Sequence, residues 1–261
     1  MRFALFLSLS SSFLLACARA GAEGAAAAPT PVRPILVELF TSQGCSSCPP
    51  ADRLLARLAA VAPGERAIVP LAFHVDYWNH LGWQDPFSSA DWSERQRRYG
   101  VGFGGGRIYT PELVVAGSAD CVGTDEAGLQ RLVARAAAEP VRASVQLTPA
   151  GTGEGKLTVE VAAQRVTEAG AAPTEVLVAL FENGLETPVG RGENAHRRLH
   201  NDRVVRRLVR ALALPAGGGD GKTRLELPLD PAWGRSHLGL VAFVQEPSTL
   251  RVLAATEAAV R

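Results

Sequence analysis

Short apolar runs and segments with helical spacing follow one another through the first half of the chain. Residues 35–40 (Ile-Leu-Val-Glu-Leu-Phe) and 67–75 are nearly all apolar, which is typical of strands inside a parallel sheet. Leu54 and Leu58 lie four positions apart, as on one face of a helix. The pattern predicts strand, helix, strand, helix, strand, strand and helix over residues 35–40, 52–60, 67–75, 89–99, 112–116, 119–122 and 124–139. The strand–helix–strand start implies parallel pairing through a right-handed crossover, with the later hairpin as an antiparallel edge.

After Pro140 the pattern changes to short runs that alternate apolar and polar residues. Turns rich in Gly, Pro and Asp separate these runs. The predicted strands cover residues 143–148, 157–164, 175–182, 202–212, 223–229, 238–245 and 250–255. We therefore predict two domains, an α/β domain over 34–140 and a small antiparallel β-sandwich over 141–261.

Residues 1–20 have the features of a secretory signal peptide. A basic residue precedes about 14 mostly apolar residues, fewer than the ~20 that span a bilayer. Two processing sites compete: residues 18–20 (Ala-Arg-Ala) suit ordinary cleavage, whereas residues 14–17 (Leu-Leu-Ala-Cys) resemble a bacterial lipobox, in which Cys17 would carry a lipid. Either route exports the protein to the periplasm, and a lipid on Cys17 would be its only membrane attachment. The Ala/Pro-rich residues 21–33 are typical of a tether.

Composition and charge narrow the classes of partner. Apolar residues make up 47% of the chain, which is enough for a buried core. Lys and Arg number 27 against 26 Asp and Glu, so the net charge is +1 and no global field attracts polyanions. We expect no nucleic-acid partner.

Cys45 and Cys48 form a Cys-x-x-Cys motif between an apolar strand and the predicted start of a helix. In an exported chain, this placement indicates thiol–disulfide exchange. The positive end of the helix would lower the pKa of the Cys45 thiol and make it the exposed nucleophile. Cys48 would then resolve the mixed disulfide.

Other interpretations of the pair are a structural disulfide, a zinc site and a copper(I) site. A zinc site would need His74 or His80 to complete four ligands, because the sequence holds no second close Cys pair. Copper(I) sites rely on Met and Cys, and the single Met is the initiator. Haem attachment is disfavoured because Pro49 stands where that motif requires His. We expect neither a metal nor a cofactor.

Two further segments supply candidate site residues. Thr110 and Pro111 stand at a predicted strand start, where a cis peptide bond would form a tight turn and free neighbouring backbone groups for a substrate chain. The second segment follows the strand at 67–75 and should emerge at the sheet edge that carries the Cys45 loop. Its candidates for substrate binding are His74, Asp76, Tyr77 and Trp78. The alternative is that these side chains only pack a loop.

The motifs resemble those of known proteins. A strand, Cys-x-x-Cys-Pro and a helix, followed by Thr-Pro before a hairpin and a last helix, resemble the thioredoxin fold over roughly residues 34–140. More specific strings resemble a secreted bacterial family catalogued as domain of unknown function 1223, at residues 38–52, 73–87, 109–111, 192–194 and 204–206. The resemblance implies a thioredoxin-like fold for 34–140, with Pro111 in the cis-proline position beside the nucleophile Cys45 and the resolving Cys48. It implies no established substrate.

We therefore expect an exported thiol–disulfide oxidoreductase that acts on disulfide-bearing proteins or small molecules, with an unknown redox partner in the cell envelope. The expected catalytic residues are Cys45, Cys48 and Pro111, and Thr110 joins the substrate-binding residues. The alternative is a non-enzymatic periplasmic binding module, in which the disulfide is structural and the loop with the aromatic residues Tyr77 and Trp78 holds a ligand. The residues between the two cysteines, Ser46 and Ser47, carry no charge, so the direction of exchange stays open.

Overall fold

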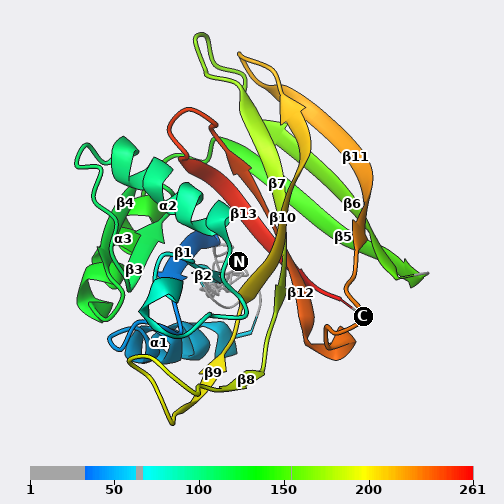
Figure 1. The fold of residues 1–261 in the computed structure, drawn as a ribbon. Coiled ribbons are helices and arrows are strands. Elements are labelled where there is room, and N and C mark those ends of the chain that lie inside the picture. The colour runs from blue at the N-terminus through cyan, green and yellow to red at the C-terminus, as the bar shows by residue number, and fades with distance from the viewer. Residues whose placement is uncertain (1–32, 63–66, 154, 261) are drawn as a thin grey trace, which may run out of the picture. The chain divides into compact units, whose positions relative to one another are not determined.

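The computed structural model describes residues 33–62, 67–153 and 155–260. This part of the chain forms thirteen β-strands, three α-helices and two short 3-10 helices (Figure 1). None of the described helices is long and apolar enough to cross a membrane. The predicted signal peptide, Cys17 and nearly all of the predicted tether lie outside the described residues.

The α-helices all belong to the first half of the described chain. Its elements are β1 (Ile35–Thr41), α1 (Pro49–Ala60), β2 (Ile68–His74), η1 (Asn79–Leu81), α2 (Ala90–Gly102), β3 (Glu112–Val115), β4 (Ala119–Val122) and α3 (Glu126–Ala137). Local sequence explains where two helices begin: Ser89 accepts a hydrogen bond from the Asp91 N–H at the start of α2, and Asp125 caps α3 through the Gly128 N–H. Each of these strands and α-helices begins and ends within a few residues of its prediction, whereas the 3-10 helix η1 was not predicted.

The second half consists of strands joined by turns. Its elements are β5 (Ala143–Gly153), β6 (Lys156–Arg165), β7 (Thr174–Glu182), β8 (Leu185–Pro188), β9 (Arg198–Asn201), β10 (Val204–Leu214), β11 (Gly219–Pro228), η2 (Arg235–His237), β12 (Leu238–Gln245) and β13 (Val252–Ala259). The short hairpin of β8 and β9 was not predicted, because four-residue strands with mixed polarity give no clear period.

One eight-stranded mixed sheet connects the two halves of the chain, in the order β13-β12-β7-β10-β2-β1-β3-β4. β1 and β2 pair in parallel, with Ile35 opposite Ile68, as the strand–helix–strand pattern predicted. β10 adds to the free edge of β2 in parallel at Val204 and Ala72, and continues antiparallel along β7. The strands of the two predicted domains therefore belong to the same sheet.

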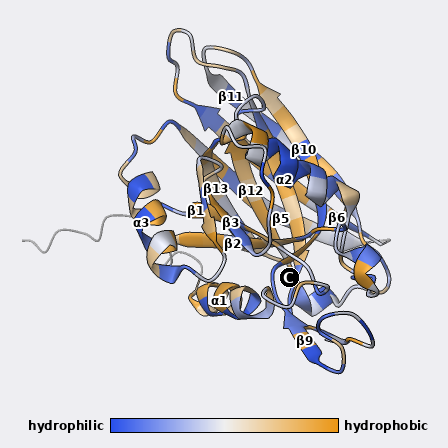
Figure 2. Ribbon diagram, turned by 60° about the vertical axis from the view of Figure 1, so that its left-hand side comes forward, coloured by the Kyte–Doolittle hydropathy of each residue, from blue (hydrophilic) through white to orange (hydrophobic). Residues whose placement is uncertain are grey.

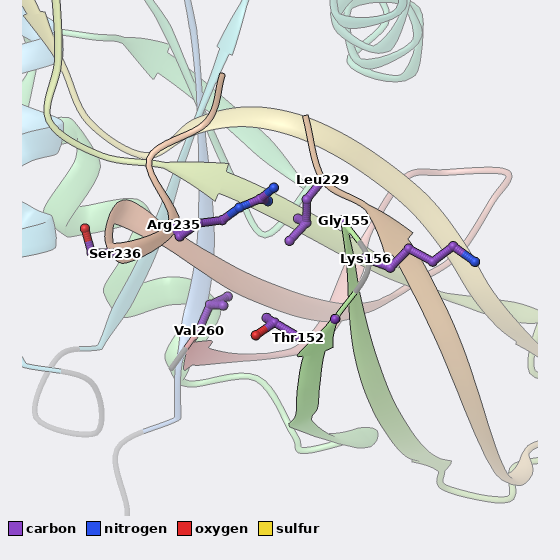
Figure 3. Close-up of a pocket in the computed structure, with 8 residues that line it drawn as sticks. Thr152, Gly155, Lys156, Leu229, Arg235, Ser236 and Val260 are labelled. Atoms are coloured by element: carbon purple, nitrogen blue, oxygen red, sulfur yellow. The ribbon is translucent and has the colours of Figure 1, made fainter. Parts of the chain in front are cut away.

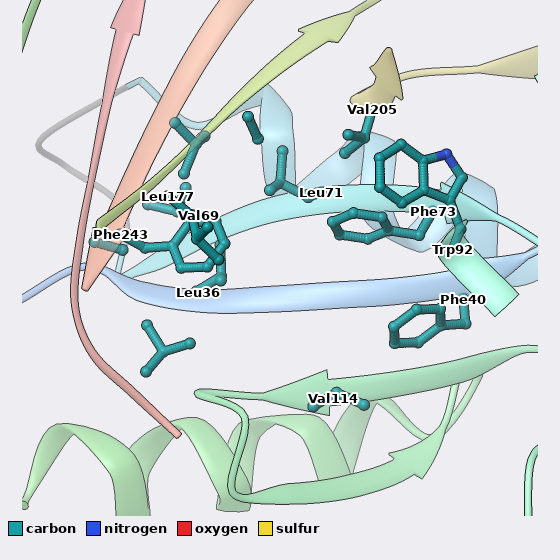
Figure 4. Packing of buried hydrophobic residues seen from close by; sticks show 14 of the residues in the cluster. Leu36, Phe40, Val69, Leu71, Phe73, Trp92, Val114, Leu177, Val205 and Phe243 are labelled. Carbon is teal, nitrogen blue, oxygen red and sulfur yellow. The ribbon is translucent and has the colours of Figure 1, made fainter. Parts of the chain in front are cut away.

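Alternation along the strands divides the core between the two faces of this sheet. On one face, apolar side chains of β1, β2, β7 and β12 pack with Trp92 and Tyr99 of α2. Figure 4 shows Trp92 next to Phe73 of β2. On the opposite face, the β1 and β2 side chains pack against α1 and α3, and those of β7 and β12 pack against a three-stranded sheet of β11, β6 and β5. Figure 2 shows apolar residues along the central strands, whereas α2 is largely polar outside its buried side.

The predicted fold class, an α/β thioredoxin-like domain followed by a small antiparallel β-sandwich, is wrong. The described chain is mostly β, with three α-helices against thirteen strands, and its largest sheet takes strands from both sides of Pro140. The physical reason is that periodicity identifies a strand but not its neighbour. The second edge of β2 is open to another strand, and Val204 of β10, more than a hundred residues away, pairs with Ala72 there.

Candidate functional site

The Cys-x-x-Cys loop joins the carboxyl end of β1 to α1. Two turn hydrogen bonds shape it, from the Cys45 N–H to the Ser42 carbonyl and from the Cys48 N–H to the Cys45 carbonyl, each 3.2 Å. Cys48 stands at the N-cap of α1, and prolines follow it in the first turn, where a missing N–H costs the helix nothing. The two cysteines form a disulfide with their Cα atoms 5.5 Å apart, so they are paired as the spacing predicted.

Both sulfurs are buried, with an exposed fraction of 0% for Cys45 and for Cys48. The prediction that Cys45 is exposed is therefore wrong for this disulfide-bonded state. The cover comes from the loop between β8 and β9, which reaches α1 from the second half of the chain (Figure 1). The buried Asn194 side chain of that loop donates to the carbonyls of Gln43 and Cys45, at 2.9 Å each.

The Thr110–Pro111 segment lies beside the disulfide, as the family resemblance implied. The Thr110–Pro111 peptide bond is cis, which confirms the prediction for that bond, and the Cys45 Sγ lies 3.9 Å from the Thr110 carbonyl oxygen. Trp78 also lies at this segment, because its Nε1 donates a hydrogen bond to the Thr110 Oγ1 at 2.8 Å. Of the predicted substrate-binding residues, Thr110 and Trp78 therefore contact the Cys45 environment directly.

Gly123 fixes the position of Pro111 against α1. Its N–H donates to the Pro111 carbonyl at 2.9 Å. A Cβ at this position would lie 2.6 Å from the Pro111 Cβ and 2.9 Å from the Ala51 Cβ, so only glycine fits without a shift. Sequence reasoning missed this role, because glycine at a strand end is common.

The other predicted site residues are held by the surrounding structure. His74 is buried and its Nδ1 lies 2.7 Å from the Asp85 Oδ2. Asp76 accepts a 2.5 Å hydrogen bond from the Ser93 hydroxyl, and the Tyr77 hydroxyl donates to Gln96 at 3.1 Å. These contacts fit the alternative that the three side chains pack a loop.

A buried carboxylate that sequence reasoning missed lies one turn into α1. Asp52 donates its N–H to the Cys48 carbonyl, and its Oδ1 accepts a 2.8 Å hydrogen bond from the Thr41 hydroxyl. Burial raises the pKa of the Asp52 carboxyl from 3.8 to about 6, against the opposing charge of His74. Burial also acts to lower the pKa of His74, but the Asp85 carboxylate outweighs it and the pKa of the imidazole is raised. Asp52 is therefore an acid–base group with a pKa near neutral on the helix that carries Cys48.

Gln43 connects the Cys-x-x-Cys loop to three other segments. Its N–H donates to the Asp85 Oδ2 at 2.8 Å, and its side-chain Oε1 accepts from the Trp83 indole at 3.2 Å. Its Nε2 donates to the Thr187 hydroxyl and the Asn201 amide oxygen of the β8–β9 hairpin. Gln43 lies in the family string at 38–52, and Trp83 and Asp85 lie in the string at 73–87, but Thr187 and Asn201 lie in none of the strings, and only the fold shows that these residues meet.

Two cavities of the described residues have walls that contain neither Cys45 nor Cys48. One of about 560 Å³ is open between the β5–β6 turn and the segment after β11 (Figure 3). Another, of about 380 Å³, has Phe87, Trp233, Arg206 and Arg207 in its walls. Neither contains a predicted site residue. The described residues hold no cluster of His, Cys, Asp and Glu that could bind a metal ion.

Fold and site together define a mostly β protein with a disulfide-bonded Cys-x-x-Cys loop at a helix start, covered by a hairpin from the second half of the chain. The chain belongs to the family described as protein of unknown function (DUF1223), whose family model matches residues 36–245.

Solved structures similar to this chain include one from Agrobacterium tumefaciens and one from Porphyromonas gingivalis. Protein AGR_C_4864 from Agrobacterium tumefaciens is 26% identical, with a TM-score of 0.65 over 87% of this chain and 94% of that chain. HBP35 of Porphyromonas gingivalis is 14% identical, with a TM-score of 0.64 over 88% of this chain and 76% of that one, which shows a shared fold alone. No curated protein matches the sequence.

Proposed function

We propose that the protein is an exported thiol–disulfide oxidoreductase whose Cys45–Cys48 pair exchanges with disulfides of proteins or small molecules in the cell envelope. The observation that carries the proposal is the position of Cys45, whose Sγ lies at the start of α1 and 3.9 Å from the Thr110 carbonyl. A substrate chain that runs past Thr110 would bring its own disulfide next to Cys45. The features of residues 1–20 support export.

The proposed exchange has two steps. In the reduced protein, the Cys45 thiolate attacks one substrate sulfur, so a Cys45–substrate disulfide forms and the other substrate sulfur leaves as a thiolate. The Cys48 thiolate then attacks the Cys45 sulfur, which closes the Cys45–Cys48 disulfide and releases the second substrate thiolate. The substrate is reduced by two electrons and the protein is oxidised by two; an envelope dithiol or disulfide partner restores the starting state.

Asp52 supports the second step. Cys48 must lose its proton before it attacks, and a carboxylate with a pKa of about 6 can accept that proton at neutral pH. Its N–H bonds to the Cys48 carbonyl, so it is on the same helical turn as the resolving thiol. We assign it as the proton acceptor for Cys48.

The burial of both sulfurs favours the alternative, a binding module in which the disulfide is structural. Under the oxidoreductase proposal, Trp78 or the β8–β9 loop must move aside before a substrate sulfur reaches Cys45. Under the alternative, this cover keeps the disulfide out of exchange. The two functions therefore differ in how easily the pair is reduced.

A redox titration distinguishes them. The full mature chain with Cys121→Ser, which removes the free thiol of the described residues, is equilibrated with glutathione and then with dithiothreitol buffers. A catalytic pair titrates above about −300 mV, whereas a structural disulfide lies below it. Replacing Cys48 with Ser should also trap mixed disulfides on Cys45 in envelope extracts, and a Cys45→Ser control should trap none. A potential below that value together with a clean gel would support the binding module.

A further inference from the structure

The loop between β8 and β9 places a carboxylate against the Cys-x-x-Cys loop. The exposed Glu193 accepts a 2.9 Å hydrogen bond from the Ser46 N–H through its Oε2. The hydrogen bonds from Ser46 lower the pKa of the Glu193 carboxyl, so this group is negative at neutral pH. The neighbouring Asn194 anchors the loop on the Cys45 carbonyl, which holds the charge in place.

Few hydrogen-bond donors remain for a thiolate at Cys45. Pro49 and Pro50 have no N–H, and the Cys48 N–H is bonded to the Cys45 carbonyl. Among the described residues, the hydrogen-bonding atoms placed at the Cys45 Sγ are the Ser47 hydroxyl at 3.3 Å and the Thr110 carbonyl oxygen at 3.9 Å. The Ser47 hydroxyl can donate a hydrogen bond to a thiolate, whereas the Thr110 carbonyl oxygen can only accept one. The helix start is therefore poorer in donors than the Cys-x-x-Cys pattern alone suggests.

We propose that Glu193 sets the redox potential of the Cys45–Cys48 pair: its negative charge beside Cys45 disfavours the thiolate, and this makes the pair a reductant rather than an oxidant. The physical link is that a stabilised thiolate stabilises the reduced protein and makes the disulfide more oxidising. A charge that opposes the thiolate has the reverse effect. This inference rests on the proposed thiol–disulfide exchange and gives it a direction.

Other charged groups also face this region. Asp52 and Arg53 lie on α1, with Asp52 on the Cys48 side. On the covering loop, Arg197 donates to the Asn194 amide oxygen at 3.1 Å. All of them are retained in the test variant, so a difference between the two proteins reports on Glu193 alone.

The test compares Glu193→Gln with the unaltered sequence, both in the mature Cys121→Ser protein. The glutamine keeps an oxygen for the Ser46 N–H and removes the charge. We expect the pKa of the reduced Cys45 thiol, measured by thiolate absorbance, to fall. At a pH above that pKa, the equilibrium with a reference dithiol should shift at least about threefold toward the reduced protein. A threefold shift corresponds to about 14 mV for a two-electron couple. The matched control is Glu226→Gln, another exposed, hydrogen-bonded carboxylate whose partner is Lys156.

Salt separates a charge effect from a structural one. At about 1 M salt the screening length falls to ~3 Å, so the unaltered protein should move toward the potential of Glu193→Gln while the variant changes little. Equal thiol pKa values and potentials in the two proteins, or a difference that salt leaves intact, would overturn the inference. This equilibrium is measurable with dithiothreitol even if the disulfide is structural. Failure of the proposed function would instead appear as a potential below about −300 mV and an absence of trapped partners.

Discussion

Two buried residues near the disulfide, Asp52 and Gly123, have roles that their neighbours in the sequence do not indicate. Asp52 looks like an ordinary acidic residue in the first turn of a helix, yet the sheet buries it and bonds it to Thr41. Gly123 looks like a turn residue, yet it is wedged between Pro111 and Ala51. Both roles depend on contacts made by the folded chain.

Asp52→Asn tests the cost of burying the carboxylate. Since the folded pKa of about 6 exceeds the ordinary 3.8, the protonated form is favoured in the folded state, and this stability is lost as pH rises through 6. The difference in free energy of unfolding, variant minus unaltered protein, should therefore increase by roughly 2–3 kcal/mol from pH 4 to pH 7, at about 1.4 kcal/mol per pKa unit. Urea unfolding across this range measures it, with Glu226→Gln as the exposed control.

The same variant probes the proposed proton transfer. Loss of the acceptor should slow release of a mixed disulfide on Cys45 by a factor on the order of 10² at pH 7, because general base catalysis typically contributes at least that much. Stopped-flow release of a chromogenic thiol measures the rate. An unchanged rate would remove Asp52 from the mechanism and leave it as a structural group.

Gly123→Ala should destabilise the protein by roughly 1–3 kcal/mol, because the new methyl group overlaps Pro111 and Ala51. Gly105→Ala is the matched control: its Cβ would meet only one backbone atom, at 4.0 Å. Thermal unfolding of both oxidised variants makes the comparison. Equal melting temperatures would mean that the contact at Gly123 relaxes without cost.

Among the elements, the β8–β9 hairpin contributes most to the site and was the least visible in the sequence. Gln43 bonds to Thr187 and Asn201 of this hairpin, and Asn194 of its loop bonds back to Gln43 and Cys45. The loop thus forms the cover of the disulfide. Its short strands have no clear hydrophobic period, so only the family string at 192–194 pointed to it.

Asn194→Ala should loosen this cover. Removing the buried amide takes the Asn194 donor from the Gln43 carbonyl and leaves the Cys45 carbonyl with the Cys48 N–H alone, which costs about 1–3 kcal/mol. We also expect dithiothreitol to reduce the disulfide several-fold faster, because the loop no longer holds down the Cys45 backbone. Arg191→Ala, an exposed position on the same loop, serves as the control. If both variants are reduced at the rate of the unaltered protein, the loop is not the barrier to access.

At the scale of the molecule, the first half of the chain depends on the second. β10 covers the edge of β2, and the core on one face of the sheet combines Phe40 and Phe73 with Phe181 and Phe243. Strands and core residues from both sides of the predicted boundary at Pro140 therefore belong to one sheet and one core.

A fragment of residues 34–140 should therefore fail to fold cooperatively. It would expose the β2 edge and the apolar face that β7 and β12 complete, which favours aggregation. Expression of the fragment beside the chain from residue 33 onward, followed by urea unfolding, provides the measurement. A soluble fragment with one sharp transition would instead establish 34–140 as an independent domain.

Local patterns along the chain were enough to predict the three α-helices, most strands and the Cys45–Cys48 pairing, because hydrophobic period and motif spacing are local properties. The expectation of a cis bond before Pro111 rested instead on its expected place opposite the Cys-x-x-Cys loop, since an X–Pro bond has little local preference. Tertiary structure decided which strands are neighbours, what covers the disulfide and which carboxylates lie near it. β10 meets β2, and Glu193 meets Ser46, across more than a hundred residues. Such contacts depend on free strand edges and complementary surfaces that exist only in the folded chain, and hydrophobic pattern does not encode them position by position.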